Sequence, residues 1–292
     1  MGVARLSGTA ALLTAGAVAL AGCGATAARP APAHSSAHSS AHSSTRSPAP
    51  APVQARPGGG AAAQAGPAAT TSAATPAAAP RKTLRLGAKG KAVTWMQRRL
   101  ADLGYRPGSA DGRYGGTTLA AVWAFQKVNG IRPTSTIARR TWEALESPRA
   151  PKVLVPRGRP TRAEVNLTKQ IMVLYVGGQP KLITHISSGS GVPYCETAVW
   201  QGKEQRFCGS ARTPTGDYRT TWRASGWHRS YLGELYNPIF FNGGIAFHGA
   251  LSVPLSPASH GCVRMPMNVA EVLPGLLGKG VPVHVRGRFA GL

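Results

Sequence analysis

Acidic side chains are scarce in this chain. Only ten Asp and Glu stand against 34 Lys and Arg, which gives a formal net charge of +24 at pH 7, and the first acidic residue is Asp102. A protein this basic attracts polyanions by long-range electrostatics. Nucleic acid, anionic lipid headgroups and anionic surface polymers are therefore the partners to weigh, beside the simpler interpretation of a basic surface that is only solvated.

Cysteine is also scarce, with four residues in 292. None of the spacings is C-x-x-C, which argues against a thiol–disulfide exchange site. Cys195 and Cys208 flank the polar segment "ETAVWQGKEQRF", and in an oxidising compartment such a pair favours a disulfide over two free thiols. Cys23 belongs to the N-terminal segment, so this pairing leaves Cys262 as the unpaired thiol.

The first residues predict export. Residues 1–22 combine a basic start with an apolar run, as a signal peptide does, and "LAGC" at 20–23 joins the end of this run to Cys23. This resembles a bacterial lipobox, which implies that Cys23 is lipidated and becomes the mature N-terminus. An uncleaved membrane anchor is the alternative. Either way the protein is expected outside the cytoplasm and tethered to a membrane, which argues against nucleic acid and leaves anionic lipids and cell-wall polymers as partners.

Residues 23–80 contain almost no side chains that could form a core. They are nearly all Ala, Pro, Ser, Thr, Gly, Gln and His, and "AHSS" occurs three times in succession. Such a composition predicts a disordered linker, long enough to let a lipid-held protein reach material away from the bilayer.

Helical periodicity begins after the linker, in residues 81–148. Apolar residues fall at helical spacing from Val93 to Leu103 and from Leu119 to Phe125, with Thr117 as the expected N-cap, and a shorter third helix is expected near Leu145. The segments "LRLGAKGKAVTWMQRRLADLGY" and "DGRYGGTTLAAVWAFQKVNG" resemble the peptidoglycan-binding domain of wall enzymes. "IRPTSTIARR" replaces the second "DG" turn usual in that family.

The period changes to that of β-strands in residues 160–288. "AEVNLTKQIMVLYV", "KLITHIS", "TPTGDYRTTW", "NPIFF", "GIAFHG" and "VPVHV" are strand-like, and a helix is expected around 267–277. We therefore predict a multidomain protein. A small three-helix bundle precedes a mainly β domain, either a β-sandwich or a partly closed barrel with one or two helices.

The stretch "SPASHGCVRMP" near the C-terminus contains candidate catalytic residues. His260 and Cys262 are two residues apart, and "FHG" supplies His248 upstream. A thiol beside an imidazole can act as a nucleophile, and glycine-rich backbone can receive an oxyanion. An inert core cysteine and a zinc site of His248, His260 and Cys262 are the alternatives. No Asp or Glu lies between Glu234 and Glu271 to serve as the carboxylate of a catalytic zinc site.

"HG" followed by "SHGC" and a hydrophobic residue resembles the catalytic signature of L,D-transpeptidases of the YkuD type, and "TPTG", "AEVNLTKQ" and "SSGSG" resemble other stretches of that domain. The resemblance implies a mostly β enzyme that needs no metal or cofactor. It implies Cys262 as nucleophile, His248 as general base, the Gly249 carbonyl as its orienting partner, and the amides of Gly261 and Cys262 as an oxyanion hole.

The resemblance also implies roles for flanking residues. Ser259 and His260 would shape the site, and Arg264, where many members have Asn, would pair with a substrate carboxylate or brace the loop. Tyr236 would supply a hydroxyl near the oxyanion or simply pack.

The function implied is attack by Cys262 on a peptidoglycan stem peptide, with loss of D-alanine, a thioester intermediate and a 3→3 cross-link. An L,D-carboxypeptidase, and a lipoprotein that anchors the wall without catalysis, are the alternatives. Carbapenems acylate this family as a group, so they are the expected covalent inhibitors.

Overall fold

The computed structural model describes residues 78–290. The predicted signal peptide, the lipidation site at Cys23 and all but the last three residues of the predicted linker lie outside these residues. Ala79, within those three, is buried, and its N–H donates a hydrogen bond to Glu146 Oε1 at 3.1 Å. In the described range, no helix has the length and apolar character needed to cross a membrane.

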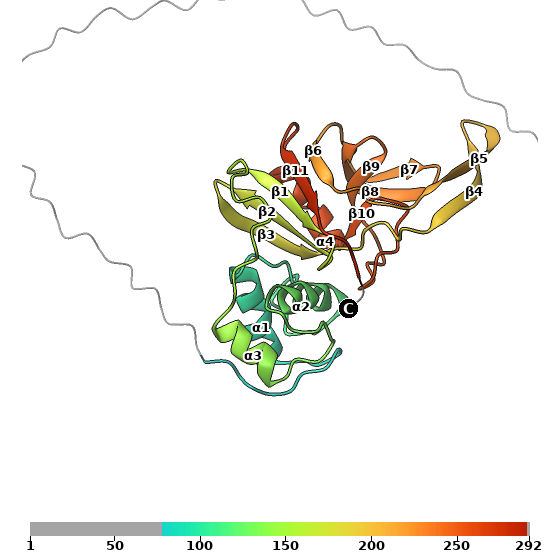
Figure 1. The fold of residues 1–292 in the computed structure, drawn as a ribbon. Coiled ribbons are helices and arrows are strands. Elements are labelled where there is room, and N and C mark those ends of the chain that lie inside the picture. Colours follow the sequence, from blue (N-terminus) through green and yellow to red (C-terminus); the bar gives the residue numbers. More distant parts are fainter. Residues whose placement is uncertain (1–77, 291–292) are drawn as a thin grey trace, which may run out of the picture. The chain divides into compact units, whose positions relative to one another are not determined.

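The first part of the described chain is helical and contains α1 (Lys91–Asp102), α2 (Gly116–Val128) and α3 (Arg139–Glu146) (Figure 1). Val93, Met96 and Leu100 are fully buried, as the helical spacing predicts. The N-cap of α2 is Gly115, so Thr117 lies within the first turn of the helix and does not cap it. The N-cap prediction was wrong because Gly115 already adopts the extended conformation from which the helix starts.

The second part is mainly β and contains two larger sheets. The five-stranded sheet has the order β3 (Gln179–His185), β2 (Ile171–Val176), β1 (Arg162–Asn166), β11 (Pro282–Arg286) and β6 (Gly216–Arg219). "AEVNLTKQIMVLYV" forms two antiparallel strands, because the chain turns at Leu167–Gln170, where Gln170 has φ +50°.

The four-stranded sheet has the order β10 (Val263–Met265), β9 (Ile245–Gly249), β8 (Gly233–Asn242) and β7 (Trp227–Ser230). One apolar core joins residues of both sheets, for example Val165 and Leu174 with Phe247 and Val263. The arrangement is a sandwich of separate sheets, with no closed barrel in residues 78–290. The short helices α4 (Met267–Ala270) and α5 (Leu273–Leu276) stand where one helix was expected, and they pack on the same core.

Strands β4 (Pro193–Trp200) and β5 (Lys203–Ser210) form a third, two-stranded sheet, an antiparallel hairpin that extends from the sandwich (Figure 1). From the sequence, only a polar insertion is predicted here. The hairpin contains the Cys195–Cys208 disulfide, which agrees with the predicted pairing.

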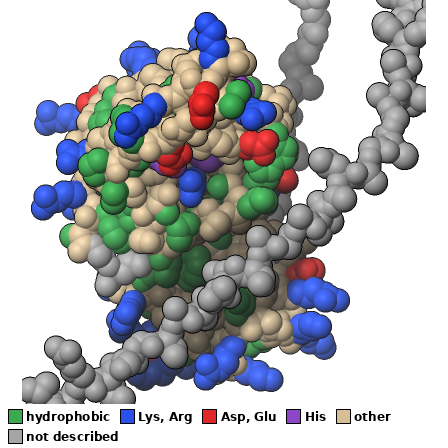
Figure 2. Space-filling view, turned by 90° about the vertical axis from the view of Figure 1, so that its right-hand side faces the viewer, with side chains coloured by type: hydrophobic (Ala, Val, Ile, Leu, Met, Phe, Trp, Pro, Cys, Tyr) green, Lys and Arg blue, Asp and Glu red, His purple; other side chains and the backbone are tan. Residues whose placement is uncertain are grey.

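The helices cover one face of strands β2 and β3. Met172 and Leu174 point into the sandwich core, whereas Ile171, Val173 and Tyr175 belong to the core of the helical part. Strand β2 is therefore buried on both faces, which explains why its sequence, "IMVLYV", is apolar throughout and does not alternate with polar residues. Figure 2 shows Lys and Arg side chains distributed around one face of the molecule, with fewer Asp and Glu, as the net charge leads one to expect.

Candidate active site

Two neighbouring strands bring His248 and Cys262 into one cavity. β9 ends with His248 and Gly249, and β10 runs parallel to it, with Arg264 opposite His248. Cys262 immediately precedes β10. Parallel strands need a long crossover connection, and residues 250–262 provide it. The spacing between "FHG" and "SHGC" is therefore the length of this crossover.

The imidazole of His248 is held in a defined orientation. Its Nδ1 lies 2.9 Å from the carbonyl oxygen of Gly249, and its side chain is buried. A carbonyl oxygen can only accept, so Nδ1 carries the proton and Nε2 has the free lone pair. The pKa of His248 is lowered to about 4, mainly by burial. The hydrogen bond to Gly249 raises this pKa, and the charge of Arg264 lowers it. The imidazole is thus a neutral base at pH 7.

Cys262 is half-buried and is the one free cysteine among the described residues. Burial raises the pKa of its thiol, while a backbone hydrogen bond from Ala246 and the charge of Arg264 act in the opposite direction. Its Sγ lies 3.6 Å from the carbonyl oxygen of Gly244, to which the thiol donates. The resting pair is therefore a neutral thiol and a neutral imidazole, because both environments disfavour the charged form.

The turn before Cys262 requires glycine. Gly261 has φ +140°, and a Cβ there would lie 2.9 Å from the carbonyl oxygen of Arg212. Thr213 Oγ1 donates to the Gly261 carbonyl at 2.6 Å, and the Gly261 amide donates to Ser259 Oγ at 3.0 Å. Ser259 in turn donates to the carbonyl of Cys262. The Gly261 amide, expected in the oxyanion hole, is thus already a donor to Ser259.

His260 and Tyr236 have different neighbours. His260 Nε2 is 2.7 Å from Glu196 Oε1 of β4, and its ring meets that of Tyr194 edge-on at 4.7 Å. Tyr236 lies opposite Gly249 in the sheet, and its ring packs beside Trp227 at 5.2 Å. The roles of both residues in binding stay predictions.

A cavity of about 680 Å³ contains His248, Cys262 and Arg264. Aromatic side chains of the β4–β5 hairpin, the β7–β8 hairpin and the loop between β6 and β7 form its walls; they are Tyr194, Trp200, Trp222, Trp227, Tyr231 and Phe240. In the part of the chain that the structure describes, no three His, Cys, Asp or Glu side chains gather closely enough to hold a metal ion.

Several residues around the site are not predicted from the sequence. "TPTG" and "SSGSG" stand out as motifs, but the pattern alone assigns no role to Thr213 or Ser187. Ser187 exchanges backbone hydrogen bonds with Arg264, both at 3.0 Å, and thereby holds β10 in place. The aromatic walls could not have been found from the sequence, because their members lie on segments whose distance depends on the tertiary fold.

Comparisons with known proteins agree with this geometry. Residues 160–285 match the model of the L,D-transpeptidase catalytic domain, and residues 89–145 match that of a peptidoglycan binding domain. No curated protein matches the chain. The crystal structure of an L,D-transpeptidase (residues 123–326) from Xylanimonas cellulosilytica is 34% identical, with a TM-score of 0.62, and the alignment covers 70% of this chain and 98% of that one.

A second solved structure, an L,D-transpeptidase from Stackebrandtia nassauensis, is 23% identical with a TM-score of 0.40, over 72% of this chain and 97% of that one. This likeness is too distant to support a functional conclusion. The sandwich, the His248–Cys262 cavity and the similarity to the Xylanimonas cellulosilytica enzyme together show that this chain belongs to the L,D-transpeptidase family and contains a peptidoglycan-binding domain.

Proposed function

We propose that this protein cross-links peptidoglycan by attack of Cys262 on a stem peptide. The observation that supports this most directly is the hydrogen bond between His248 Nδ1 and the Gly249 carbonyl, because it reserves Nε2 as a base in the cavity that holds the thiol. Since burial keeps the imidazole neutral at pH 7, it is ready to take a proton.

The first half-reaction forms an acyl-enzyme. The Cys262 sulfur bonds to the carbonyl carbon of the third stem residue while its proton passes to His248 Nε2. The bond to the terminal D-alanine then breaks, and the leaving amine takes the proton from the imidazolium. The products are a thioester on Cys262, free D-alanine and a neutral histidine.

The second half-reaction decides the outcome. The side-chain amine of a diamino acid on another stem attacks the thioester, loses a proton to His248, and expels the Cys262 sulfur, which is reprotonated. The product is a 3→3 cross-link. If water attacks in place of the amine, the same intermediate gives a tripeptide, and the enzyme acts as an L,D-carboxypeptidase.

The N-terminal segment completes the proposal. We place the enzyme outside the cytoplasm, held by lipid on Cys23 and able to reach the wall through residues 24–80. Mass analysis of the mature protein purified from membranes tests this, and an unmodified Cys23 or a retained signal peptide would contradict it.

Product analysis tests the catalytic proposal. The full chain is incubated with a purified tetrapeptide stem, and mass spectrometry should show a cross-linked dimer and released D-alanine. Cys262→Ala should remain folded and give neither product. If tripeptide were the only product, the enzyme would be a carboxypeptidase. Turnover by folded Cys262→Ala would overturn the assignment of Cys262 as the nucleophile.

Inhibitor labelling provides a second readout of the same nucleophile. A carbapenem should add the mass of one drug molecule to the wild-type chain, at Cys262, because a thiol can open the strained lactam as it opens a peptide bond. The Cys262→Ala variant should gain no mass. An adduct that persists in this variant would place the reactive group elsewhere.

A further inference from the structure

The β4–β5 hairpin has two different faces. Successive strand residues point to opposite sides, so Tyr194, Glu196, Ala198 and Trp200 share one face. Along the paired strands, Tyr194, Ala198, Trp200, Gln205 and Phe207 are half-buried, whereas nearly all their neighbours are exposed. The alternation shows that one face of the hairpin is turned toward the body of the domain. We call these residues, with Glu196, the inner face.

Near the base of the hairpin, the inner face contacts the catalytic loop, which is the crossover of residues 250–262 between β9 and β10. Glu196 Oε1 accepts a hydrogen bond from His260 Nε2 at 2.7 Å, and the Tyr194 ring meets His260 edge-on. His260 is two residues from Cys262, and Tyr194 lines the same cavity. The hairpin therefore reaches the segment that carries the nucleophile.

The inner face also contacts a second element of the cavity. Phe207 stacks on Tyr231 with ring centroids 4.2 Å apart, and Trp200 meets the same ring edge-on at 6.1 Å. Tyr231 lies in the turn between β7 and β8. The inner face thus bridges two sides of the cavity, and Tyr194 and Trp200 are part of its lining.

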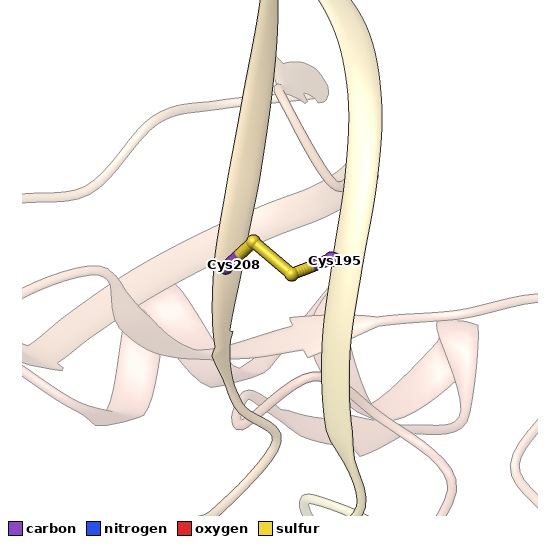
Figure 3. Close-up of a disulfide and its surroundings, with 2 residues drawn as sticks. All are labelled: Cys195 and Cys208. Atoms are coloured by element: carbon purple, nitrogen blue, oxygen red, sulfur yellow. A yellow bond between two sulfur atoms is a disulfide. The ribbon is translucent and has the colours of Figure 1, made fainter.

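The disulfide lies on the other face. Cys195 and Cys208 are directly opposite each other in the hairpin, both exposed, and the bond crosses between the two strands (Figure 3). Cys195 lies between Tyr194 and Glu196, the two residues that contact His260. An isolated two-stranded hairpin is only marginally stable in water, so a covalent link at this position fixes the register of the inner face.

We propose that the β4–β5 hairpin is a wall of the substrate site that binds the donor stem peptide, and that the Cys195–Cys208 disulfide and Glu196 hold this wall against the catalytic loop. The aromatic residues supply apolar contact to the peptide, and Glu196 is a positioning residue that acts through His260. The identity of the ligand rests on the proposed function. Because no residue of the hairpin takes part in the proposed bond-making and proton-transfer steps, loss of the wall should weaken binding more than chemistry.

Substitution of the disulfide tests the wall. In the full chain, Cys195→Ser with Cys208→Ser should raise KM for the tetrapeptide donor about tenfold and leave kcat within about threefold, because the hairpin holds the peptide without taking part in the reaction. Trp200→Ala should act in the same direction. Val199→Ala, one residue away on the exposed outer face, is the matched control and should leave both constants unchanged.

Glu196 is tested by paired variants. Glu196→Ala removes the acceptor for His260 Nε2 and should raise KM, whereas Glu196→Gln retains an acceptor oxygen and should restore most of the affinity. Equal increases of KM in the two variants would mean that the hydrogen bond does not position His260.

Alkylation of Cys262 by iodoacetamide separates this proposal from the proposed function. The small reagent does not need the wall, so its rate should be the same in wild type and in the disulfide variant, but tetrapeptide should protect only the wild type. If wild type is protected yet forms no product, the catalytic proposal fails and the wall stands. The proposal that the hairpin binds the peptide would be overturned if the variants had the same KM and the same protection as wild type, or if tetrapeptide did not protect wild type.

Discussion

At the scale of single residues, burial has a larger effect than neighbouring charges on the pKa values of His248 and Cys262. His248 is 3% exposed, and its pKa falls to about 4, while the pKa of Cys262 is raised. Arg264 lies opposite His248 in the sheet. Its charge lowers the pKa of His248, as burial does, and it lowers the pKa of Cys262, which burial raises. A cationic neighbour therefore favours both the neutral base and the thiolate.

The pH dependence of the reaction follows from these directions. His248 can accept a proton only when neutral, so kcat/KM should fall on the acid side only as pH approaches about 4, and not near 6.5. Arg264→Met removes a charge that lowers the pKa of His248, so its acid limb should move to higher pH, by less than about one unit because burial is the larger cause.

The measurement is kcat/KM for the tetrapeptide from about pH 3.5 to about pH 8 in both proteins, a range that brackets the acid limb. Arg98→Met, which removes an exposed guanidinium from α1, is the control and should reproduce the wild-type profile. An acid limb that does not move in Arg264→Met, or that moves to lower pH, would show that Arg264 does not act on the base.

At the scale of elements, the catalytic loop is shaped by segments that flank it in space. The Thr213 side chain holds the Gly261 carbonyl, Ser187 pairs with Arg264, and the Ser188 carbonyl accepts from the amides of Ala258 and Ser259. "SSGSG" and "TPTG" thus fix both sides of "SHGC". Gly261 is held by both of these sides, because its carbonyl accepts from Thr213 and its amide donates to Ser259, which is itself bonded to Ser188.

Gly261→Ala should be damaging for two reasons. The positive φ of +140° disfavours alanine, and the new methyl group would lie 2.9 Å from the Arg212 carbonyl oxygen, which is backbone and cannot easily move. We expect destabilisation of about 1–3 kcal/mol and roughly a hundredfold decrease of kcat/KM or more, since the displaced turn carries Cys262.

Urea unfolding and tetrapeptide turnover measure the two effects of Gly261→Ala. Gly233→Ala, at a positive φ of +113° with open space around its Cβ, is the matched control for backbone strain alone and should keep most of its activity. Wild-type activity in Gly261→Ala would show that the turn tolerates a shift and that its geometry is not essential.

At the scale of the whole described chain, the helical part and the sandwich share buried polar contacts as well as a core. Lys127 of α2 is 5% exposed, and its Nζ lies 2.8 Å from His185 Nδ1 of β3 and 3.2 Å from the Gln170 carbonyl oxygen. His185 Nε2 donates to the Val253 carbonyl at 3.0 Å. Val253 lies in the crossover between His248 and Cys262, so the peptidoglycan-binding domain is linked to the catalytic loop through two side chains.

This buried lysine should make stability depend on pH. Burial lowers the pKa of Lys127 to about 7 from its ordinary 10.5. The unfolded chain then binds more protons between pH 7 and 10.5, so the free energy of unfolding should rise with pH through that window, by at most about 1.4 kcal/mol per pH unit. Lys127→Met has no such group, and its stability should lack this contribution.

Urea unfolding of wild type and Lys127→Met at about pH 7, 8 and 9 measures the difference, in which the effects of the other titrating groups largely cancel. Lys91→Met, at the exposed start of α1, is the control and should follow the wild type. A wild-type minus Lys127→Met difference that is constant with pH would contradict the lowered pKa.

Features that depend on local chemistry were determined by the sequence alone. Apolar spacing identified the helices, and the positions of "HG" and "SHGC" identified the family, because these patterns lie within short stretches of chain. The Cys195–Cys208 pair was predictable because its members are only 13 positions apart in the sequence. The hairpin around it was not, since its residues are mostly polar and only one face packs against the domain.

Only the tertiary structure decided which distant residues meet. Thr213 with Gly261, Glu196 with His260 and Lys127 with His185 are separated by 48, 64 and 58 residues, and each contact depends on strand order and register. The choice of a sandwich over a barrel was decided in the same way, by which strands pair at the sheet edges. The lowered pKa of His248 also needed the fold, because its main cause is the burial of the imidazole, which only the packed structure produces.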